Sequence, residues 1–197
     1  MLILLLSIGL TGSCGHSDEG GGPDEGEVIT RVELSFTPEA GGTPILALFD
    51  DPDGDGGDAP TIDDIQLAAG NYTLALRFEN GLETPAEDIT IEISDESAEH
   101  QVFLTGSAVD GPATDNAGAP LQHSYDDMDA NGLPIGLVNS IVAVTGSGQL
   151  IITLRHLPPI GDRMVKSSEL NGDVALSGFS AIGGATDVQV QFSVTVP

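Results

Sequence analysis

Hydrophobic and polar residues alternate along most of the chain after residue 27. In residues 28–37, for example, Val32, Leu34 and Phe36 fall on one face of an extended chain and polar side chains fall on the other. A period of two is typical of a β-strand with one buried face. The same alternation recurs in further ranges: 43–49, 65–67, 72–78, 100–104, 122–125, 138–144, 149–156 and 188–196. It predicts about nine or ten strands, joined by turns that are rich in Gly, Pro, Asn and Asp.

This succession of strands predicts an all-β fold, and we expect an immunoglobulin-like β-sandwich. Residues 65–67 and 72–78 flank Ala69, Gly70 and Asn71, which form a turn sequence. We therefore expect these two strands to pair as a hairpin. The even positions of 72–78 are all large and apolar, so they predict one buried face.

One segment has the signals of a short helix near residues 85–93. Thr84 is a favourable N-cap, and Pro85 suits the first helical position. Ile89 and Ile93 follow four residues apart, as on one helix face. The odd positions 89, 91 and 93 also alternate as in a strand, which leaves a strand as the alternative.

The irregular region 158–184 carries polar residues and a Gly-Gly pair and no clear period. It predicts a long loop over one end of the sandwich. Long ordered loops on such folds often carry binding functions.

The amino-terminal residues determine the expected location of the protein. Residues 1–10 are apolar and uncharged, but too few to span a bilayer, which takes about 20 residues. They resemble the apolar region of a bacterial signal peptide that ends in a lipobox, with small residues before Cys14. We therefore expect a signal peptide over 1–13, a lipidated Cys14 with an acidic Gly-rich tether over 14–27, and one β-sandwich domain over 28–197. Gly15 lacks the inner-membrane retention signal that Asp provides after the lipidated Cys, so an outer-membrane lipoprotein is expected.

The charge excludes several partners. The chain has 31 Asp and Glu against 5 Lys and Arg, which gives a formal charge of −26. Nucleic acids and anionic lipids are bound by clusters of basic residues, so neither is expected as a partner.

Cys14 is the only cysteine, so no disulfide forms within the chain. Standard catalytic motifs are missing from the sequence, which favours a protein that is not an enzyme over a hydrolase with an unrecognised carboxylate pair.

Two acidic segments have the chemistry of cation loops. Both fit the pattern D-x-D-x-[DN]-G, the first half of a calcium loop, in which side-chain oxygens surround a hard cation and Gly permits the tight bend. The candidate ligands are Asp51, Asp53, Asp55 and Asp58 in the first loop and Asp127, Asp129 and Asn131 in the second. Oxygen ligands favour calcium as the cofactor. The alternative for each loop is a turn in which Asp and Asn side chains accept hydrogen bonds from the backbone.

Two histidines offer a different kind of site. His100 shares the parity of the apolar positions in 100–104, and His156 does so in 149–156. If these strand ends adjoin, the pair would bind a transition metal or haem, or transfer a proton. No third ligand is evident from the sequence, and two separate core histidines are the alternative.

Short motifs in a particular order give the chain a family resemblance. They are Gly41-Gly42-Thr43-Pro44, Asp51-Pro52-Asp53-Gly54, Glu99-His100-Gln101, Asp127-x-Asp129-x-Asn131-Gly132, Leu154-Arg155-His156 and Gly183-Gly184-x-Thr186-Asp187. In this order the chain resembles small bacterial lipoproteins that are often named type 1 periplasmic binding fold superfamily proteins. That name implies two α/β lobes, whereas the alternation here predicts strands throughout. The resemblance implies a lipid-anchored envelope protein and brings no activity with it.

The leading functional hypothesis is therefore a non-catalytic, lipid-anchored module of the cell envelope. Calcium in the acidic loops would order one end of the sandwich, which binds an unknown envelope protein or extracellular ligand. A metal- or haem-handling lipoprotein that uses His100 and His156 is the alternative.

Overall fold

The computed structural model describes residues 27–54 and 56–197, and these contain twelve strands, four of them only two residues long. The strands are β1 (Arg31–Pro38), β2 (Ile45–Asp50), β3 (Thr61–Ile62), β4 (Ile65–Gln66), β5 (Gly70–Asn80), β6 (Glu87–Asp88), β7 (His100–Thr105), β8 (Val109–Asp110), β9 (Leu121–Tyr125), β10 (Val138–Ala143), β11 (Gly146–His156) and β12 (Ala185–Val196). Two α-helices, α1 (Ile89–Asp95) and α2 (Leu170–Ser177), and the 3₁₀-helix η1 (Phe179–Ala181) accompany them. The predicted strands are confirmed, and the additional ones are short.

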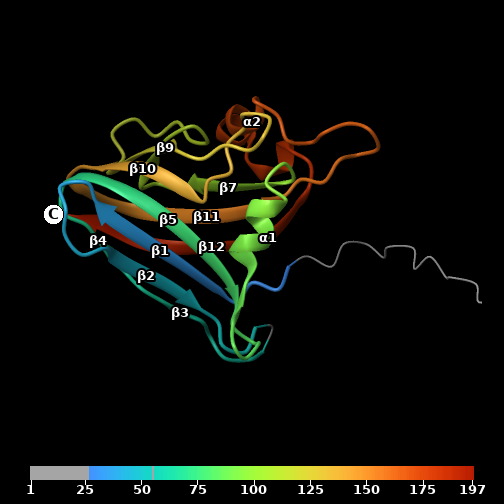
Figure 1. Cartoon of the computed structure of the whole chain (residues 1–197). Coiled ribbons are helices and arrows are strands. Elements are labelled where there is room, and N and C mark those ends of the chain that lie inside the picture. The colour runs from blue at the N-terminus through green and yellow to red at the C-terminus, as the bar shows by residue number, and fades with distance from the viewer. Residues whose placement is uncertain (1–26, 55) are drawn as a thin grey trace, which may run out of the picture.

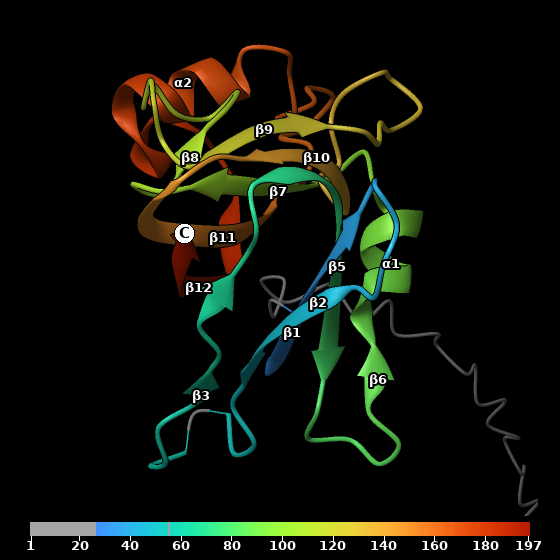
Figure 2. The same ribbon diagram turned by 90° about the vertical axis from the view of Figure 1, so that its left-hand side faces the viewer.

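The strands form two sheets that face each other (Figures 1 and 2). The larger sheet has the order β3-β2-β1-β5-β10-β9-β8, with β6 paired to β5, and the smaller has the order β4-β12-β11-β7. Pairing is antiparallel except between β8 and β9 and between β4 and β12. The structure thus confirms a mostly β, two-sheet architecture.

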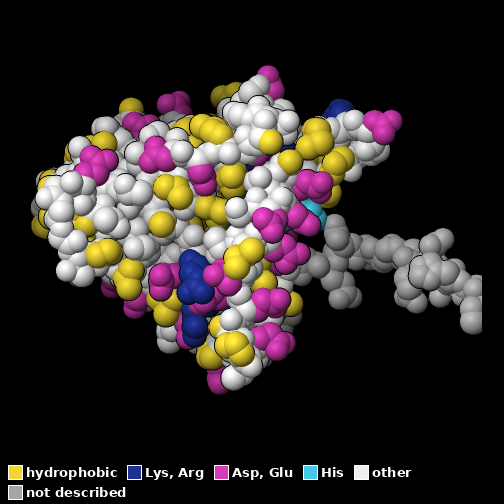
Figure 3. Space-filling view, viewed as in Figure 1, with side chains coloured by type: hydrophobic (Ala, Val, Ile, Leu, Met, Phe, Trp, Pro, Cys, Tyr) yellow, Lys and Arg dark blue, Asp and Glu magenta, His cyan; other side chains and the backbone are white. Residues whose placement is uncertain are grey.

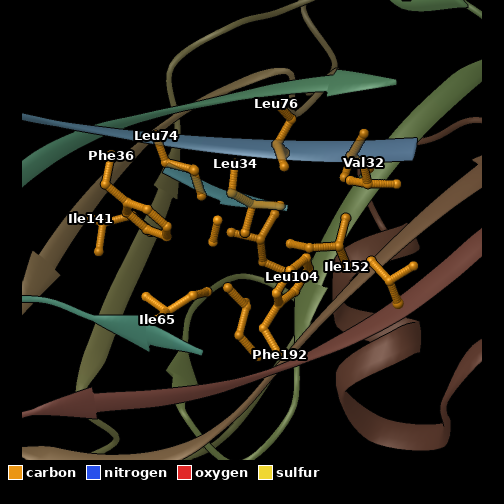
Figure 4. Packing of buried hydrophobic residues seen from close by; sticks show 14 of the residues in the cluster. Val32, Leu34, Phe36, Ile65, Leu74, Leu76, Leu104, Ile141, Ile152 and Phe192 are labelled. Atoms are coloured by element: carbon orange, nitrogen blue, oxygen red, sulfur yellow. The ribbon is translucent and has the colours of Figure 1, made fainter. Parts of the chain in front are cut away.

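The core lies between the two sheets, as Figure 4 shows. Leu34 and Phe36 of β1 point from the larger sheet toward Ile152 of β11 and Phe192 of β12 in the smaller one. All four side chains are fully buried. Their parity in the sequence predicted this face, because alternate residues of a strand point to opposite sides.

The predicted hairpin of residues 65–67 and 72–78 is wrong. Strand β4 pairs in parallel with β12, with Ile65 opposite Val194, whereas β5 lies between β1 and β10 in the other sheet. The chain between them passes from one sheet to the other. Alternation indicates which face of a strand is buried, but both sheets bury a face against the same core, so it does not identify the neighbouring strand.

The short helix is present but begins later than predicted. Helix α1 begins at Ile89, and its N-cap is Asp88, whose side chain accepts a hydrogen bond from the Thr90 amide. Residues 87 and 88 pair with β5 as β6, which keeps the preceding residues out of the helix. Ile89 and Ile93 are buried, as their spacing predicted.

Residues 158–184 are not simply a loop, because α2 and η1 form within them. Leu170 and Val174, one turn apart on α2, pack with Phe103 of β7 in a second, smaller apolar cluster. Phe103 has the parity opposite to that of its buried neighbours in β7, so this cluster covers the outer face of the smaller sheet. No helix in the described part of the chain has the length and apolar character needed to cross a bilayer.

Candidate metal centre

His100 and His156 lie side by side at the ends of neighbouring strands. They are directly opposite each other in the antiparallel pair of β7 and β11. Opposite residues in such a pair place their side chains on the same face. The two imidazole rings stack, with centroids 4.7 Å apart and planes 10° from parallel. The structure therefore brings together the two histidines that the sequence singled out.

The hydrogen bonding of His100 leaves one ring nitrogen available. The side chain is 1% exposed, and Nδ1 lies 3.3 Å from the backbone oxygen of Glu96. A carbonyl oxygen only accepts, so Nδ1 donates and Nε2 of a neutral ring carries the lone pair. Nε2 makes no hydrogen bond with any described residue. Burial lowers the pKa of the His100 imidazole below 6.5, which favours the neutral ring. Metal-bound histidines typically have this arrangement.

Glu96 supplies a third donor. One ligand atom each from Glu96, His100 and His156 lie within 4.8 Å of one another. Glu96 is the C-cap of α1, where the backbone carbonyls give the helix end a partial negative charge that attracts cations. The spacing Glu-x-x-x-His was the available sequence signal for this residue. That spacing is common in sequences and does not by itself predict a metal site. It brings Glu96 close to His100 here because the chain turns between the end of α1 and the start of β7.

Glu27 faces the same cluster from the start of the described chain. Its Oε1 lies 3.5 Å from His100 Nε2, and its side chain is 16% exposed. Burial, followed by the negative charges of Glu92, Asp187 and Glu96, raises the pKa of the Glu27 carboxyl to about 7. In the sequence, Glu27 falls in the predicted tether 14–27, because its neighbours are acidic and Gly-rich and give no sign of burial.

A buried lysine holds the backbone of the site. Lys166 Nζ donates hydrogen bonds to the backbone oxygens of Ser97 at 2.7 Å and His100 at 2.9 Å. It also forms an ion pair with Asp129, whose Oδ2 is 3.0 Å away, and both side chains are fully buried. These contacts connect the turn between α1 and β7 with two distant loops. Burial lowers the pKa of the Lys166 ammonium, and the bond and charge of Asp129 oppose that effect.

The second acidic loop uses its oxygens within the protein. Asp127 accepts hydrogen bonds from the amides of residues 136, 137 and 138, and Asp129 Oδ1 accepts from those of Asn131 and Leu133. Asp129 Oδ2 pairs with Lys166. These hydrogen bonds are those of the turn alternative, and Lys166 already supplies a positive charge to Asp129. Calcium binding by Asp127, Asp129 and Asn131 stays a prediction.

The first acidic loop lies at a cavity. Asp53 Oδ2 accepts a hydrogen bond from the amide of Asp58, and Asp51 and Asp53 line a cavity of about 600 Å³. Glu27 lines the same cavity. Asp55 lies outside the described residues. Calcium binding by this loop remains a prediction.

Acidic side chains surround the histidines at the surface. Figure 3 shows histidine atoms among magenta carboxylates beside α1. Asp187, near the start of β12, and Glu27 both line the adjoining cavity. Such a concentration of negative charge attracts cations to this side of the domain.

Cys14, the expected lipidation site, lies outside the described residues, so its role remains a prediction. The function of the histidine site is inferred from its geometry, because no protein family model, no curated protein and no solved structure matches the chain.

Proposed function

We propose that this protein is a metal-binding module of the cell envelope, which holds a divalent transition metal ion through Glu96, His100 and His156. The observation that carries the proposal is the buried Nε2 of His100, which makes no hydrogen bond with the described residues while Nδ1 donates to the Glu96 carbonyl. Lipid attachment at Cys14, an outer-membrane location and the immunoglobulin-like type of the sandwich are parts of the same proposal. They rest on the sequence pattern and, for the fold, on two facing and mainly antiparallel sheets.

Two imidazole nitrogens and one carboxylate form a donor set that suits Zn²⁺ and neighbouring transition metals. Ligand atoms around a tetrahedral zinc ion lie about 3.3 Å apart, since each bond is about 2.0–2.1 Å long. The three donors here lie within 4.8 Å of one another, so they must approach by up to about 1.5 Å when they bind an ion. The stacked imidazole rings must also turn, because the lone pair of a ring nitrogen lies in the ring plane and the two planes are nearly parallel. Glu96 is exposed, which gives its side chain room to rotate toward an ion, whereas the His156 side chain is only 16% exposed and stacks on His100. Binding without catalysis is the simplest role for this set.

Haem is a weaker candidate for the same histidines. The cavity beside the cluster is lined by four carboxylates, those of Glu27, Asp51, Asp53 and Asp187. A haem group is a large apolar ring with anionic propionates, so this lining would repel it. The same carboxylates would attract a small cation electrostatically.

Zinc binding is tested by calorimetry and by thermal unfolding with added Zn²⁺, in the chain carrying Cys14→Ser so that the thiol does not compete. Binding to the native state alone raises stability by about 2.7 kcal/mol when free zinc is a hundredfold above Kd. We expect His100→Ala and His156→Ala each to abolish most of this gain.

Two histidine variants outside the cluster serve as matched controls. His123 is buried and hydrogen-bonded to Asn139, and His16 belongs to the predicted tether. His123→Gln and His16→Ala should retain the zinc response. Equal responses in all four variants would contradict the proposal.

A further inference from the structure

Glu27 and His100 present two ligand atoms to each other with no hydrogen bond between them. The Oε1–Nε2 distance is 3.5 Å, longer than the 2.7–3.2 Å of ordinary hydrogen bonds. Glu27 Oε2 is also buried and has no hydrogen-bond partner among the described residues. Buried polar atoms are nearly always hydrogen-bonded, and a bound cation would satisfy acceptor atoms of this kind.

The distance between Glu27 Oε1 and His100 Nε2 is close to the distance between two ligand atoms of one metal ion. Two ligands of a tetrahedral zinc ion lie about 3.3 Å apart. An ion could therefore bind Glu27 Oε1 and His100 Nε2 together at this separation. Glu27 lies outside the group of three residues whose donor atoms are within 4.8 Å of one another, so its carboxylate must move toward Glu96 and His156 to share their ion. The surrounding charges also favour a bound cation at this point. The negative charges of Glu92 and Glu96 repel the Glu27 carboxylate, and a divalent cation would relieve that repulsion.

We propose that Glu27 is the fourth ligand of the ion, so that the bound metal clamps the segment before β1 onto the ends of β7 and β11. This inference rests on the proposed function and extends it. Glu27 leads into β1 of the larger sheet, whereas His100 and His156 belong to the smaller sheet. A four-coordinate ion would thus connect both sheets at the point where the predicted tether joins the domain. Binding of the metal would order that junction.

The test compares Glu27→Gln with Glu99→Gln in the full chain carrying Cys14→Ser. Glu99 is the matched control, since its Oε2 lies 3.9 Å from His156 Nε2 and the proposal gives this nearby carboxylate no part in binding the ion. We expect Glu27→Gln to weaken Zn²⁺ binding at least tenfold, about the smallest effect of losing a group in a metal's outer shell. Glu99→Gln should change it less than threefold.

Hydrogen exchange provides a readout of the clamp. Added Zn²⁺ should slow amide exchange in residues 28–30 of the parent chain but not of Glu27→Gln. The metal-free Glu27→Gln protein should also melt at a higher temperature than its parent, because a crowded buried charge is removed. A Glu27 that only supports the fold would melt lower when changed.

The outcomes separate the two proposals. If zinc does not bind the parent chain, the proposed function fails. If zinc binds and depends on His100 and His156, but Glu27→Gln keeps both the affinity and the protection of residues 28–30, only the clamp is overturned. A larger loss in Glu99→Gln than in Glu27→Gln would assign the fourth position to Glu99 and overturn it as well.

Discussion

Lys166 Nζ donates a hydrogen bond to the backbone oxygen of His100, 2.9 Å away, although the two residues belong to different parts of the chain. The same ammonium group binds the carbonyl of Ser97 and the carboxylate of Asp129. A lysine thus occupies the position beside Asp129 that the loop pattern led us to expect for a cation. It also ties the turn that carries Glu96 and His100 to the rest of the domain.

Lys166→Met should destabilise the protein strongly. The substitution keeps most of the side-chain volume but leaves the Asp129 carboxylate buried without its ion pair. Removing one partner of a buried pair costs about 3–5 kcal/mol. Urea unfolding measures the loss, and the exposed Asp173 provides a control, since Asp173→Asn should change stability by less than about 0.5 kcal/mol. A small effect of Lys166→Met would mean that the pair is dispensable.

The two acidic loops should differ in their response to calcium. Asp129→Asn is expected to lower the melting temperature equally in calcium and in chelator, because its oxygens bind amides and Lys166. Asp53→Asn, if the first loop binds calcium, should lower it only in calcium. A calcium-dependent effect at Asp129 would contradict our description of the second loop.

His123 should make stability fall as the pH falls. Burial lowers the pKa of its imidazole below 6.5, and Nε2 is bonded to Asn139 Oδ1 at 2.9 Å. Below pH 6.5 the unfolded chain gains a proton at this residue while the folded ring stays neutral, so acid favours unfolding. The unfolding free energy should decrease by up to about 1.4 kcal/mol per pH unit relative to His123→Gln, which does not titrate.

The measurement for His123 is a difference between two pH profiles from pH 7.5 to 5. The raised pKa of Glu27 acts with the opposite sign over this range, because the folded state then holds the extra proton. Glu27 is present in both proteins and cancels. Parallel profiles would show that His123 does not stay neutral in the fold.

Val174→Ala should show that α2 is part of the folded domain. Val174 is buried against the smaller apolar cluster, whereas Leu176 on the same helix is 86% exposed. The loss of two buried methyl groups costs about 2 kcal/mol with the cavity included. Leu176→Ala should change stability by less than about 0.5 kcal/mol. Similar values for both in urea unfolding would contradict this packing.

Cys14→Ser should release the protein from membranes. The proposal of a lipid anchor depends on this thiol, the only one in the chain. Cell fractionation and incorporation of labelled fatty acid measure the effect, and Ser17→Ala in the predicted tether is the control. Membrane association that persists in Cys14→Ser would show another means of attachment.

Local patterns predicted the strands and their buried faces well. Leu34 and Phe36 were expected on one face, and both are fully buried. The physical reason is that the side-chain direction in a strand depends only on parity. Pairing is different, since Ile65 of β4 joins β12 through contacts that no local pattern encodes.

By itself, the amino-acid sequence determined the two-sheet character of the protein, the acidic charge and the inward parity of His100 and His156. Only the tertiary structure decided that these histidines stack, that Glu96 and Glu27 adjoin them, and that Lys166 neutralises Asp129. The reason is that alternation follows from the geometry of a single strand. The proposed site with four donors depends instead on where the end of α1, two strand ends and the segment before β1 meet in space.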